Sequence, residues 1–313
     1  MTGGSINALV TGIRADATGG RSNIESQAAI VAPTGIHSTN TAGAQITTSG
    51  AGTINSTANG VGTGIIATSS GGTVLDPFSI NVGAAIGNIT AFGTGVSAST
   101  TGSSANVINI NTTAAITATG RGVSVTAGTF GNTGTINIGG DITGATGVYT
   151  NIGNYTVNVD AGVTVTSTGN GFSNGAIYLV NGANTLINNG TLIANGTGTA
   201  GLHYSSPNGM ATNTATGTIT GSTGVYYQNN ASLTNAGGIT GTGVGATDAG
   251  IRSLGGTFNN TGSISGNTGL YNSGNVFNVN NTGGTITGAT HGISMAGGFL
   301  RLVNTGTITG TDG

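Results

Sequence analysis

Hydrophobic residues recur along this chain in two short motifs that alternate over most of its length. The first motif is a glycine followed by an apolar residue, which is Ile13, Ile36, Ile65, Val96, Val123, Val148, Phe172, Leu202, Val225, Ile251, Leu270 or Ile293. The second reads roughly Asn-x-Gly-Thr-Ile-Thr-Gly, with copies at Asn132 to Ile136, Asn189 to Leu192, Gly217 to Gly221, Asn235 to Gly241, Asn260 to Gly266, Asn281 to Gly288 and Asn304 to Gly310. Such regularity predicts a repeat architecture with a period of roughly 25 residues.

Each motif places an apolar residue between polar ones in a β-branched run, which is the period-two pattern of a strand with one buried face. Glycine and asparagine bound the runs, as turns with positive φ require. Strands this short form no stable hairpin alone. They gain stability if each repeat makes one coil and the equivalent strands of successive coils pair in parallel. The sequence therefore predicts an all-β, right-handed, single-stranded parallel β-helix (β-solenoid), a single rod over residues 1–313 with about 12 coils.

This fold makes two further predictions about individual residues. Asparagines at the turns should form side-chain amide ladders from coil to coil. Extra residues should loop out where repeats are long, for example at Asp76-Pro77-Phe78, because proline suits a loop better than an interior strand. An α-solenoid is the main alternative, but glycine, threonine and asparagine are poor helix formers and no 3.6-residue apolar period is visible.

Composition narrows the classes of function. The chain has 63 glycines, no cysteine and five basic residues, all arginine, spread over its length. This excludes a thiolate metal site or disulfide framework and the dense basic patch of a nucleic-acid surface. No apolar run is long enough for a membrane-spanning helix. We predict no cofactor, metal or catalytic site, and no enzyme activity.

Several patterns match catalytic or nucleotide-binding motifs by chance. Gly196 to Gly201 has dinucleotide-binding spacing and Gly171 to Gly175 has nucleophile-elbow spacing, but both motifs need a following helix. We therefore interpret Phe172 as the core residue of its coil. A carbohydrate-cleaving enzyme needs two carboxylates within about 5 to 10 Å. Asp141 and Asp160 could approach each other across adjacent coils, which leaves this alternative open.

Together, the two motifs resemble the repeats of bacterial autotransporter passenger domains, of the pertactin-like and AIDA-like kind, and of related two-partner-secreted proteins. The resemblance covers about residues 5 to 310. It implies an extracellular location at a bacterial cell surface, with anchoring to the outer membrane through a segment outside this chain, and a role in adhesion, aggregation or biofilm contacts. No signal segment or translocator barrel accompanies the repeats, so we expect a fragment truncated at both ends.

The residue after each apolar member of the first motif should point outward from the coil. Arginine, histidine and tyrosine are rare in this chain, but they are frequent at these outward positions. We therefore predict a partner-binding ladder made of Arg14, His37, Tyr149, His203, Tyr226, Arg252 and Tyr271. Tyrosine and arginine are frequent at interface hot spots. The alternative is that tyrosine is simply a strong strand former that stabilises the sheet.

The sequence leaves several functions open. An adhesive structural rod, binding glycans or proteins of host or bacterial surfaces or a second copy of itself, comes first. A second is a subunit of a self-assembling homo-oligomer, filament or sheet, joined through strand edges. A third is an ice-binding β-solenoid that uses outward Thr-x-Thr arrays, as at Thr218-Ile219-Thr220. The array is interrupted at Gly238-Ile239-Thr240, Ser263-Ile264-Ser265 and Thr135-Ile136-Asn137, which counts against this function.

Overall fold

The computed structural model describes residues 5–48, 52–57, 62–70, 79–84, 87–102, 106–206, 208–245 and 247–311. Regular structure in these ranges is entirely β-strand, without any α-helix. The parallel strands stack as a β-solenoid of about 11 turns of about 25 residues. This confirms the predicted all-β solenoid, with about one turn fewer than expected. By its internal contacts the chain divides into two units, residues 1–157 and 158–313, which are described separately.

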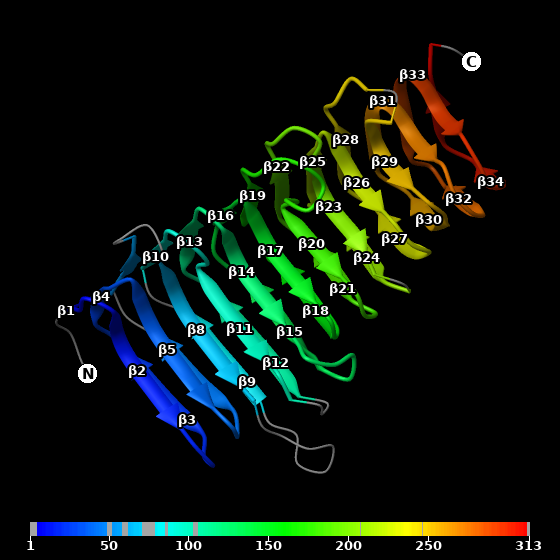
Figure 1. The fold of residues 1–313 in the computed structure, drawn as a ribbon. Helices are drawn as coiled ribbons and strands as arrows, with labels where there is room; N and C mark the ends of the chain where they lie inside the picture. Colours follow the sequence, from blue (N-terminus) through cyan, green and yellow to red (C-terminus); the bar gives the residue numbers. More distant parts are fainter. Residues whose placement is uncertain are drawn as a thin grey trace. The chain divides into compact units, whose positions relative to one another are not determined.

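In the first unit every turn contributes three strands, and equivalent strands pair in parallel to form three ladders (Figure 1). The first ladder contains β1 (Ser5–Asn7), β4 (Ala29–Val31), β7 (Ile54–Ser56), β10 (Asn88–Ala91), β13 (Ala115–Ala118) and β16 (Ile142–Gly144). The second contains β2 (Thr11–Ala17), β5 (Thr34–Asn40), β8 (Thr63–Ser69), β11 (Val96–Thr100), β14 (Arg121–Thr126) and β17 (Thr146–Asn151). The third contains β3 (Ser22–Ser26), β6 (Ala44–Thr48), β9 (Ser79–Ala84), β12 (Val107–Thr112) and β15 (Thr133–Ile138). Strand β18 (Asn154–Val159) contains the unit boundary.

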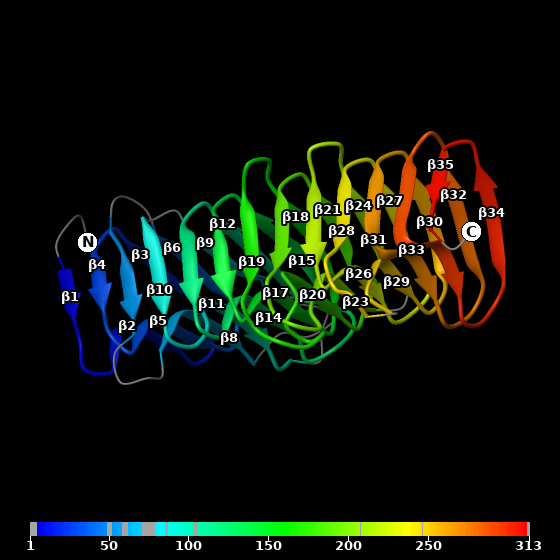
Figure 2. The same cartoon turned by 90° about the horizontal axis from the view of Figure 1, so that it is seen from above.

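The second unit repeats this plan, and Figure 2 shows strands of its first ladder, such as β28, β33 and β35, from a second side. That ladder contains β19 (Thr164–Ser167), β22 (Thr191–Ala194), β25 (Thr218–Gly221), β28 (Gly238–Gly241), the first halves of β31 (Ser263–Asn272) and β33 (Thr285–Met295), and β35 (Thr307–Thr309). The second ladder contains β20 (Ile177–Val180), β23 (Ala200–Ser205), β26 (Thr223–Tyr227), β29 (Ala249–Ser253) and the second halves of β31 and β33. The third contains β21 (Thr185–Asn188), β24 (Met210–Asn213), β27 (Ala231–Asn235), β30 (Gly256–Asn260), β32 (Phe277–Asn281) and β34 (Leu300–Asn304).

The two sequence motifs meet inside the solenoid, and their contact explains the glycine of the first motif. A Cβ on Gly224, in the second ladder, would lie 2.6 Å from Cγ2 of Ile239, which belongs to the first ladder one turn later. The same relation holds for Gly35 with Ile54, at 2.4 Å. A side chain cannot occupy that space, so glycine permits the isoleucine of the next turn to pack directly against the backbone. The two motifs therefore form one packing unit.

Asparagines at the ends of the third-ladder strands form the predicted amide ladder in the second unit. Each Nδ2 donates to the Oδ1 of the next asparagine at 2.7 to 2.8 Å, along the series Asn188, Asn213, Asn235, Asn260, Asn281 and Asn304. Each of the first five side chains is fully buried and also donates to a glycine carbonyl at the following corner. These bonds satisfy polar groups that would otherwise be costly to bury.

The first unit carries other residues at the corresponding strand ends, which are Ser26, Thr48, Ala84, Thr112 and Ile138. These residues offer no continuous chain of amide groups. This difference explains why the second sequence motif is clear in the C-terminal half of the chain and weak before it.

Three sequence assignments need comment. The copy of the second motif at Asn132 to Ile136 was wrong, because Ile136 pairs with Ile110 in the third ladder, and the first-ladder residue that precedes Val148 is Ile142. The third ladder was missed altogether, since its inward residues vary from Ala211 to Phe258 without a glycine to mark them. The predicted loop at Asp76-Pro77-Phe78 lies outside the described residues.

The amide ladder gives a direct test of what holds the turns in register. Replacing Asn260 by alanine should lower the free energy of unfolding by about 2 to 3 kcal/mol, because Asn235 loses an acceptor and Asn281 loses a donor in a buried environment. Urea denaturation followed by far-UV circular dichroism measures the loss. Asn259→Ala, on the outward side of the same strand, is the matched control and should change stability by less than about 0.5 kcal/mol. Equal losses in the two variants would contradict a structural role for the amide ladder.

Candidate functional site

The outward residues of the second ladder form one row in each unit, as the sequence predicted. In the first unit, strand pairing aligns Arg14, His37, Ile66, Ser97, Ser124 and Tyr149. We call this set, and its equivalent in the second unit, the outward row. Because the strands pair in exact register without bulges here, every member faces the same side of its sheet.

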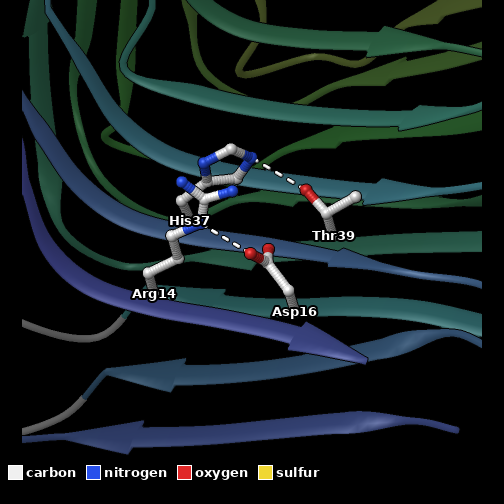
Figure 3. Close-up of polar contacts among 4 residues, drawn as sticks. All are labelled: Arg14, Asp16, His37 and Thr39. Atoms are coloured by element: carbon white, nitrogen blue, oxygen red, sulfur yellow. Dashed lines mark hydrogen bonds and ion pairs between the residues drawn. The ribbon is translucent and has the colours of Figure 1, made fainter. Parts of the chain in front are cut away.

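At the start of the row, Arg14 and His37 lie on neighbouring strands β2 and β5 (Figure 3). Arg14 Nε forms an exposed ion pair with Asp16 Oδ2 at 2.6 Å. His37 Nε2 shares a hydrogen bond of 2.9 Å with the Thr39 hydroxyl. Each contact joins two residues of the same strand that are two positions apart in sequence. The Arg14 and His37 side chains therefore lie along their strands. Asp16 offsets the charge of Arg14, so this part of the row offers a partner hydrogen bonds more than net charge.

Tyr149, the last member of the row in the first unit, carries a cation on its ring. The guanidinium carbon of Arg121 lies 3.5 Å from the ring centroid, within the range of a cation–π interaction. Arg121 also donates to the Ser124 hydroxyl at 3.3 Å. The repeat pattern does not single out Arg121, because it stands two residues before Val123, the apolar member of its motif.

In the second unit the outward row contains Tyr178, His203, Tyr226, Arg252, Tyr271 and Ser294. Tyr178 was missed, and the assignment of Phe172 as a core residue was wrong. The core residue of that turn is Ile177, which pairs with Leu202. Its preceding residue is Ala176, where other turns have glycine. The facing residue on the next turn is Leu192, which has no branch at Cβ and leaves room for the alanine methyl.

Phe172 instead lies in a turn and covers the outward row. Its ring centroid is 4.7 Å from that of Tyr226 and 6.2 Å from that of His203, with an edge-on approach to the histidine. Beneath it, Tyr178 stacks on His203 at 4.3 Å and His203 stacks on Tyr226 at 5.0 Å, with interplanar angles of 11° and 27°. Three adjacent turns therefore present a continuous aromatic strip, which we call the aromatic strip below.

Covering by Phe172 changes which predicted residues a partner can reach. His203 is only 2% exposed and Tyr226 8% exposed, although both point outward from their strands. Arg252 and Tyr271 are half-buried and remain accessible at their edges. The guanidinium of Arg252 lies 4.9 Å from the Tyr226 ring centroid and 5.4 Å from that of Phe172.

Residues 168–175, which carry Phe172, are called the Phe172 loop. Two bonds to Thr197 fix the loop beside Phe172, since Gly171 N donates to the Thr197 carbonyl and Thr197 N donates to the side-chain Oδ1 of Asn170, both at 2.9 Å. Asn174 N donates to the Gly171 carbonyl at 3.0 Å and closes the turn around Phe172. Gly171 adopts a φ of 81°, which glycine tolerates without strain. At the tip, the Phe172 carbonyl accepts a hydrogen bond of 2.6 Å from His203 Nδ1. That bond assigns the proton of a neutral His203 to Nδ1.

Burial lowers the pKa of His203 below its usual value, and the hydrogen bond to Phe172 and the nearby Gln228 side chain oppose this shift. The groups that face His203 are the Tyr178 and Tyr226 rings, and Arg252 lies beyond Tyr226. Within the described ranges, no carboxylate lies within ion-pair distance of either His203 or Arg252. A proton on His203 would therefore be buried without a carboxylate to compensate its charge.

A second ordered surface lies on the first ladder of the second unit. Its outward side chains form two columns in register, one with Thr164, Thr191, Thr218, Gly238, Ser263, Thr285 and Thr307, and one with Thr166, Ile193, Thr220, Thr240, Ser265, Thr287 and Thr309. Only Gly238 and Ile193 lack a hydroxyl group. Hydroxyls of successive turns bond directly, as in Thr218 with Thr191 at 3.1 Å and Ser265 with Thr240 at 3.3 Å. We call this surface the hydroxyl face.

Neither the chance motifs nor the acidic and histidine side chains form a catalytic or metal site in the described residues. The segments Gly171 to Gly175 and Gly196 to Gly201 each lead into a strand, β20 and β23, and neither precedes a helix. In the described part of the chain, no group of three or more histidine, cysteine, aspartate or glutamate side chains is arranged to hold a metal ion. Nor does that part contain a helix of the length and hydropathy needed to cross a membrane.

Comparison of the chain with protein-family models, with curated proteins and with solved structures gives no match. The outward row, the aromatic strip and the hydroxyl face are therefore the features of this chain that bear on its function.

The buried histidine predicts a specific dependence of stability on pH. Above the ordinary histidine pKa of about 6.5, His203 is neutral in both folded and unfolded states. As the pH falls below that value the unfolded chain takes up a proton first, because the folded pKa is lower, so the free energy of unfolding falls. Thermal unfolding between pH 7.5 and 5.5 should show this loss in the wild type and a flatter profile in His203→Phe. The exposed His291 provides the control, and His291→Asn should keep the wild-type slope. An unchanged slope in His203→Phe would contradict the assignment.

Proposed function

We propose that this chain is an extracellular structural and adhesive β-solenoid, displayed at a bacterial cell surface in the manner of an autotransporter passenger domain. The resemblance of its repeats to those passengers supports the location. The observation that carries the adhesive role is the outward row, which gathers arginine, histidine and tyrosine on one side of the second ladder in each unit. In a chain with 4% charged and 4% aromatic residues, such a concentration distinguishes this side from the others.

The accessible members of the row suit contacts with glycans or protein surfaces. Tyr149 and Tyr271 are half-buried, and each lies next to a guanidinium group, Arg121 and Arg252 respectively. An aromatic face beside an arginine combines apolar area with directed hydrogen-bond donors, which is the combination found at interface hot spots.

Replacing both Tyr149 and Tyr271 by serine tests the adhesive role. Binding of the purified protein to bacterial and host cells and to a glycan array should fall at least about fivefold per tyrosine, the effect expected of an interface anchor worth about 1 kcal/mol. The melting temperature should change little because neither ring is fully buried. Tyr226 is left intact, since it is 8% exposed and its loss would also disturb packing.

Thr234→Ser, an exposed outward position of the third ladder, is the matched control and should bind like the wild type. Unchanged binding in the double tyrosine variant would remove the outward row as the adhesive surface.

The hydroxyl face supports a second candidate function, ice binding. Parallel pairing in register sets hydroxyls about 4.8 Å apart across strands and about 6.7 Å apart along them, in an array free of charged and aromatic side chains. One interruption expected from the sequence, Thr135-Ile136-Asn137, belongs to the third ladder of the first unit and does not touch this array. An ordered layer of hydroxyl-bound water can match the repeating surface of a crystal.

Thermal hysteresis measures this second function. Thr240→Tyr, at the centre of the face, should abolish hysteresis, while Thr234→Tyr on the third ladder should preserve it. Gly238→Thr should increase hysteresis, because a Cβ at Gly238 makes only ordinary contacts of 3.8 and 3.9 Å and the new hydroxyl completes its column. Absence of hysteresis in the wild-type protein at millimolar concentration would end the ice-binding proposal.

A further inference from the structure

We propose that copies of this chain join head to tail, so that the C-terminal turn of one copy pairs with the N-terminal turn of the next. The first surface consists of β33, β34 and β35, which lie together at the C-terminal end of the second unit (Figure 2). We call it the end cup. The second surface consists of β2, β3 and β4. This inference goes beyond the adhesive function, because it concerns strand edges and not the outward row.

The end cup leaves inward residues of the solenoid uncovered. Leu302 is 43% exposed, whereas Val279, its equivalent one turn earlier, is 2% exposed. With Leu300, Ile293 and Ile308 it lines a cavity of about 300 Å³. Solenoids close such an end with a capping repeat whose outer face is polar. An end that presents apolar side chains and strand edges instead favours the addition of a further layer of strands.

Inward residues of the N-terminal turn match the end cup position by position. When β2, β3 and β4 continue the three ladders in the register of the repeat, each of their inward isoleucines lies over an uncovered residue of the cup. The pairs are Ile13 over Ile293, Ile24 over Leu302 and Ile30 over Ile308. Gly12 then follows Gly292 in the column of glycines that the core requires. The stacking that forms the core within one chain therefore continues between two chains.

This continuation requires β1 to leave its place on β4, because the end cup already provides a first-ladder strand. Ile308 of β35 packs against Gly292, and Ile6 of β1 would need the same position. Strand β1 contributes only three residues, and Ile6 is half-buried. Leu9, which follows β1, is 91% exposed. We therefore expect β35 of one copy to replace β1 of the next copy on β4.

Arg301 and Glu25 distinguish head-to-tail pairing from the two symmetric alternatives. Both are exposed outward residues of the third ladder, and neither forms an ion pair within the ranges that the structure describes. With β3 on β34, Glu25 lies opposite Val303 and diagonally across from Arg301, where long side chains of opposite charge attract each other. Two end cups face to face would instead bring two arginines together, and two N-terminal turns would bring two glutamates together.

The buried asparagine ladder also ends at the cup with spare donor capacity. Asn281 Nδ2 has three acceptors, of which one is Asn304 Oδ1. Asn304 Nδ2 has one acceptor in the described part of the chain, the Gly306 carbonyl. In the head-to-tail register Ser26 of the next copy lies directly across from Asn304. Its hydroxyl oxygen offers the amide a second acceptor.

Cysteine crosslinking of the full chain tests the proposed register. The chain contains no cysteine, so an introduced pair reports its own contact. Thr309 of β35 would lie opposite Val31 of β4 in the next copy, at the separation of paired strands, which suits a disulfide. Under mild oxidation, the variant with Thr309→Cys and Val31→Cys should give a series of linked dimers, trimers and longer oligomers on a non-reducing gel. Each single variant should stay monomeric, and a mixture of the two should give dimers only.

A matched control uses the same column one turn farther along. Asn55 pairs with Val31 within one chain, which places it about 9.6 Å from Thr309 of the neighbouring copy, too far for a disulfide. Thr309→Cys with Asn55→Cys should therefore give little linked product. Charge reversal supplies an independent measurement by analytical ultracentrifugation. Glu25→Arg should weaken association about three- to fivefold, the effect of one charge pair, and adding Arg301→Glu should restore it.

Three results would overturn head-to-tail pairing in variants with the wild-type circular dichroism spectrum. They are the absence of linked oligomers from the Thr309 and Val31 pair, equal linking through Asn55, and strong dimerisation of Thr309→Cys alone, which would indicate two end cups in contact. The adhesive function is tested separately, because Tyr149 and Tyr271 belong to neither surface. The double tyrosine variant should assemble like the wild type even where it loses binding to cells.

Discussion

Contact between a glycine of the second ladder and an isoleucine methyl of the first ladder one turn later holds this fold together. A Cβ at Gly122, for example, would approach Cγ2 of Ile142 to 2.2 Å. The contact couples two ladders and two turns at once, and it fixes both which residue faces inward and how the next turn is positioned. In the second unit the buried asparagine ladder adds a polar constraint, since its amides bond only when the turns are in register. Slipping a strand by one residue would bury polar side chains and expose the core.

This register has a consequence for the surface. Since inward positions align from turn to turn, outward positions do so as well, and a residue type that recurs in the repeat becomes a column on the protein. The hydroxyl face and the outward row are both columns of this kind, built on different ladders of the same turns. A solenoid can thus create an extended, periodic binding surface from very short strands, without the cavity on which most small-molecule sites depend.

Departures from the repeat create local features that differ from the periodic surface around them. The turn that carries Phe172 has alanine in the glycine position, opposite Leu192 in place of an isoleucine, and it inserts a loop before its second-ladder strand. That loop converts part of an open row into a covered one and buries His203 and Tyr226. Corner loops can differ in length while the core contacts of the strands stay the same, because the entropic cost of closing a loop rises slowly with its length. The residues that differ from the repeat, such as Phe172, therefore lie at a corner where the loop is longer.

Periodicity alone was sufficient to predict the parallel β-solenoid, the amide ladder and the alignment of residues such as Tyr226, Arg252 and Tyr271, because side-chain direction in a strand alternates strictly and paired turns repeat it. The third ladder escaped notice because its inward residues range in size from Ala211 to Phe258 and no glycine marks them. Which side chain covers another depends on the tertiary structure. The ring that buries His203 comes from a loop 31 residues earlier in sequence, and the space for Ala176 depends on the side chain of Leu192. Such contacts depend on which residues of different turns lie next to each other. The spacing of the repeats along the sequence does not tell which residues these are.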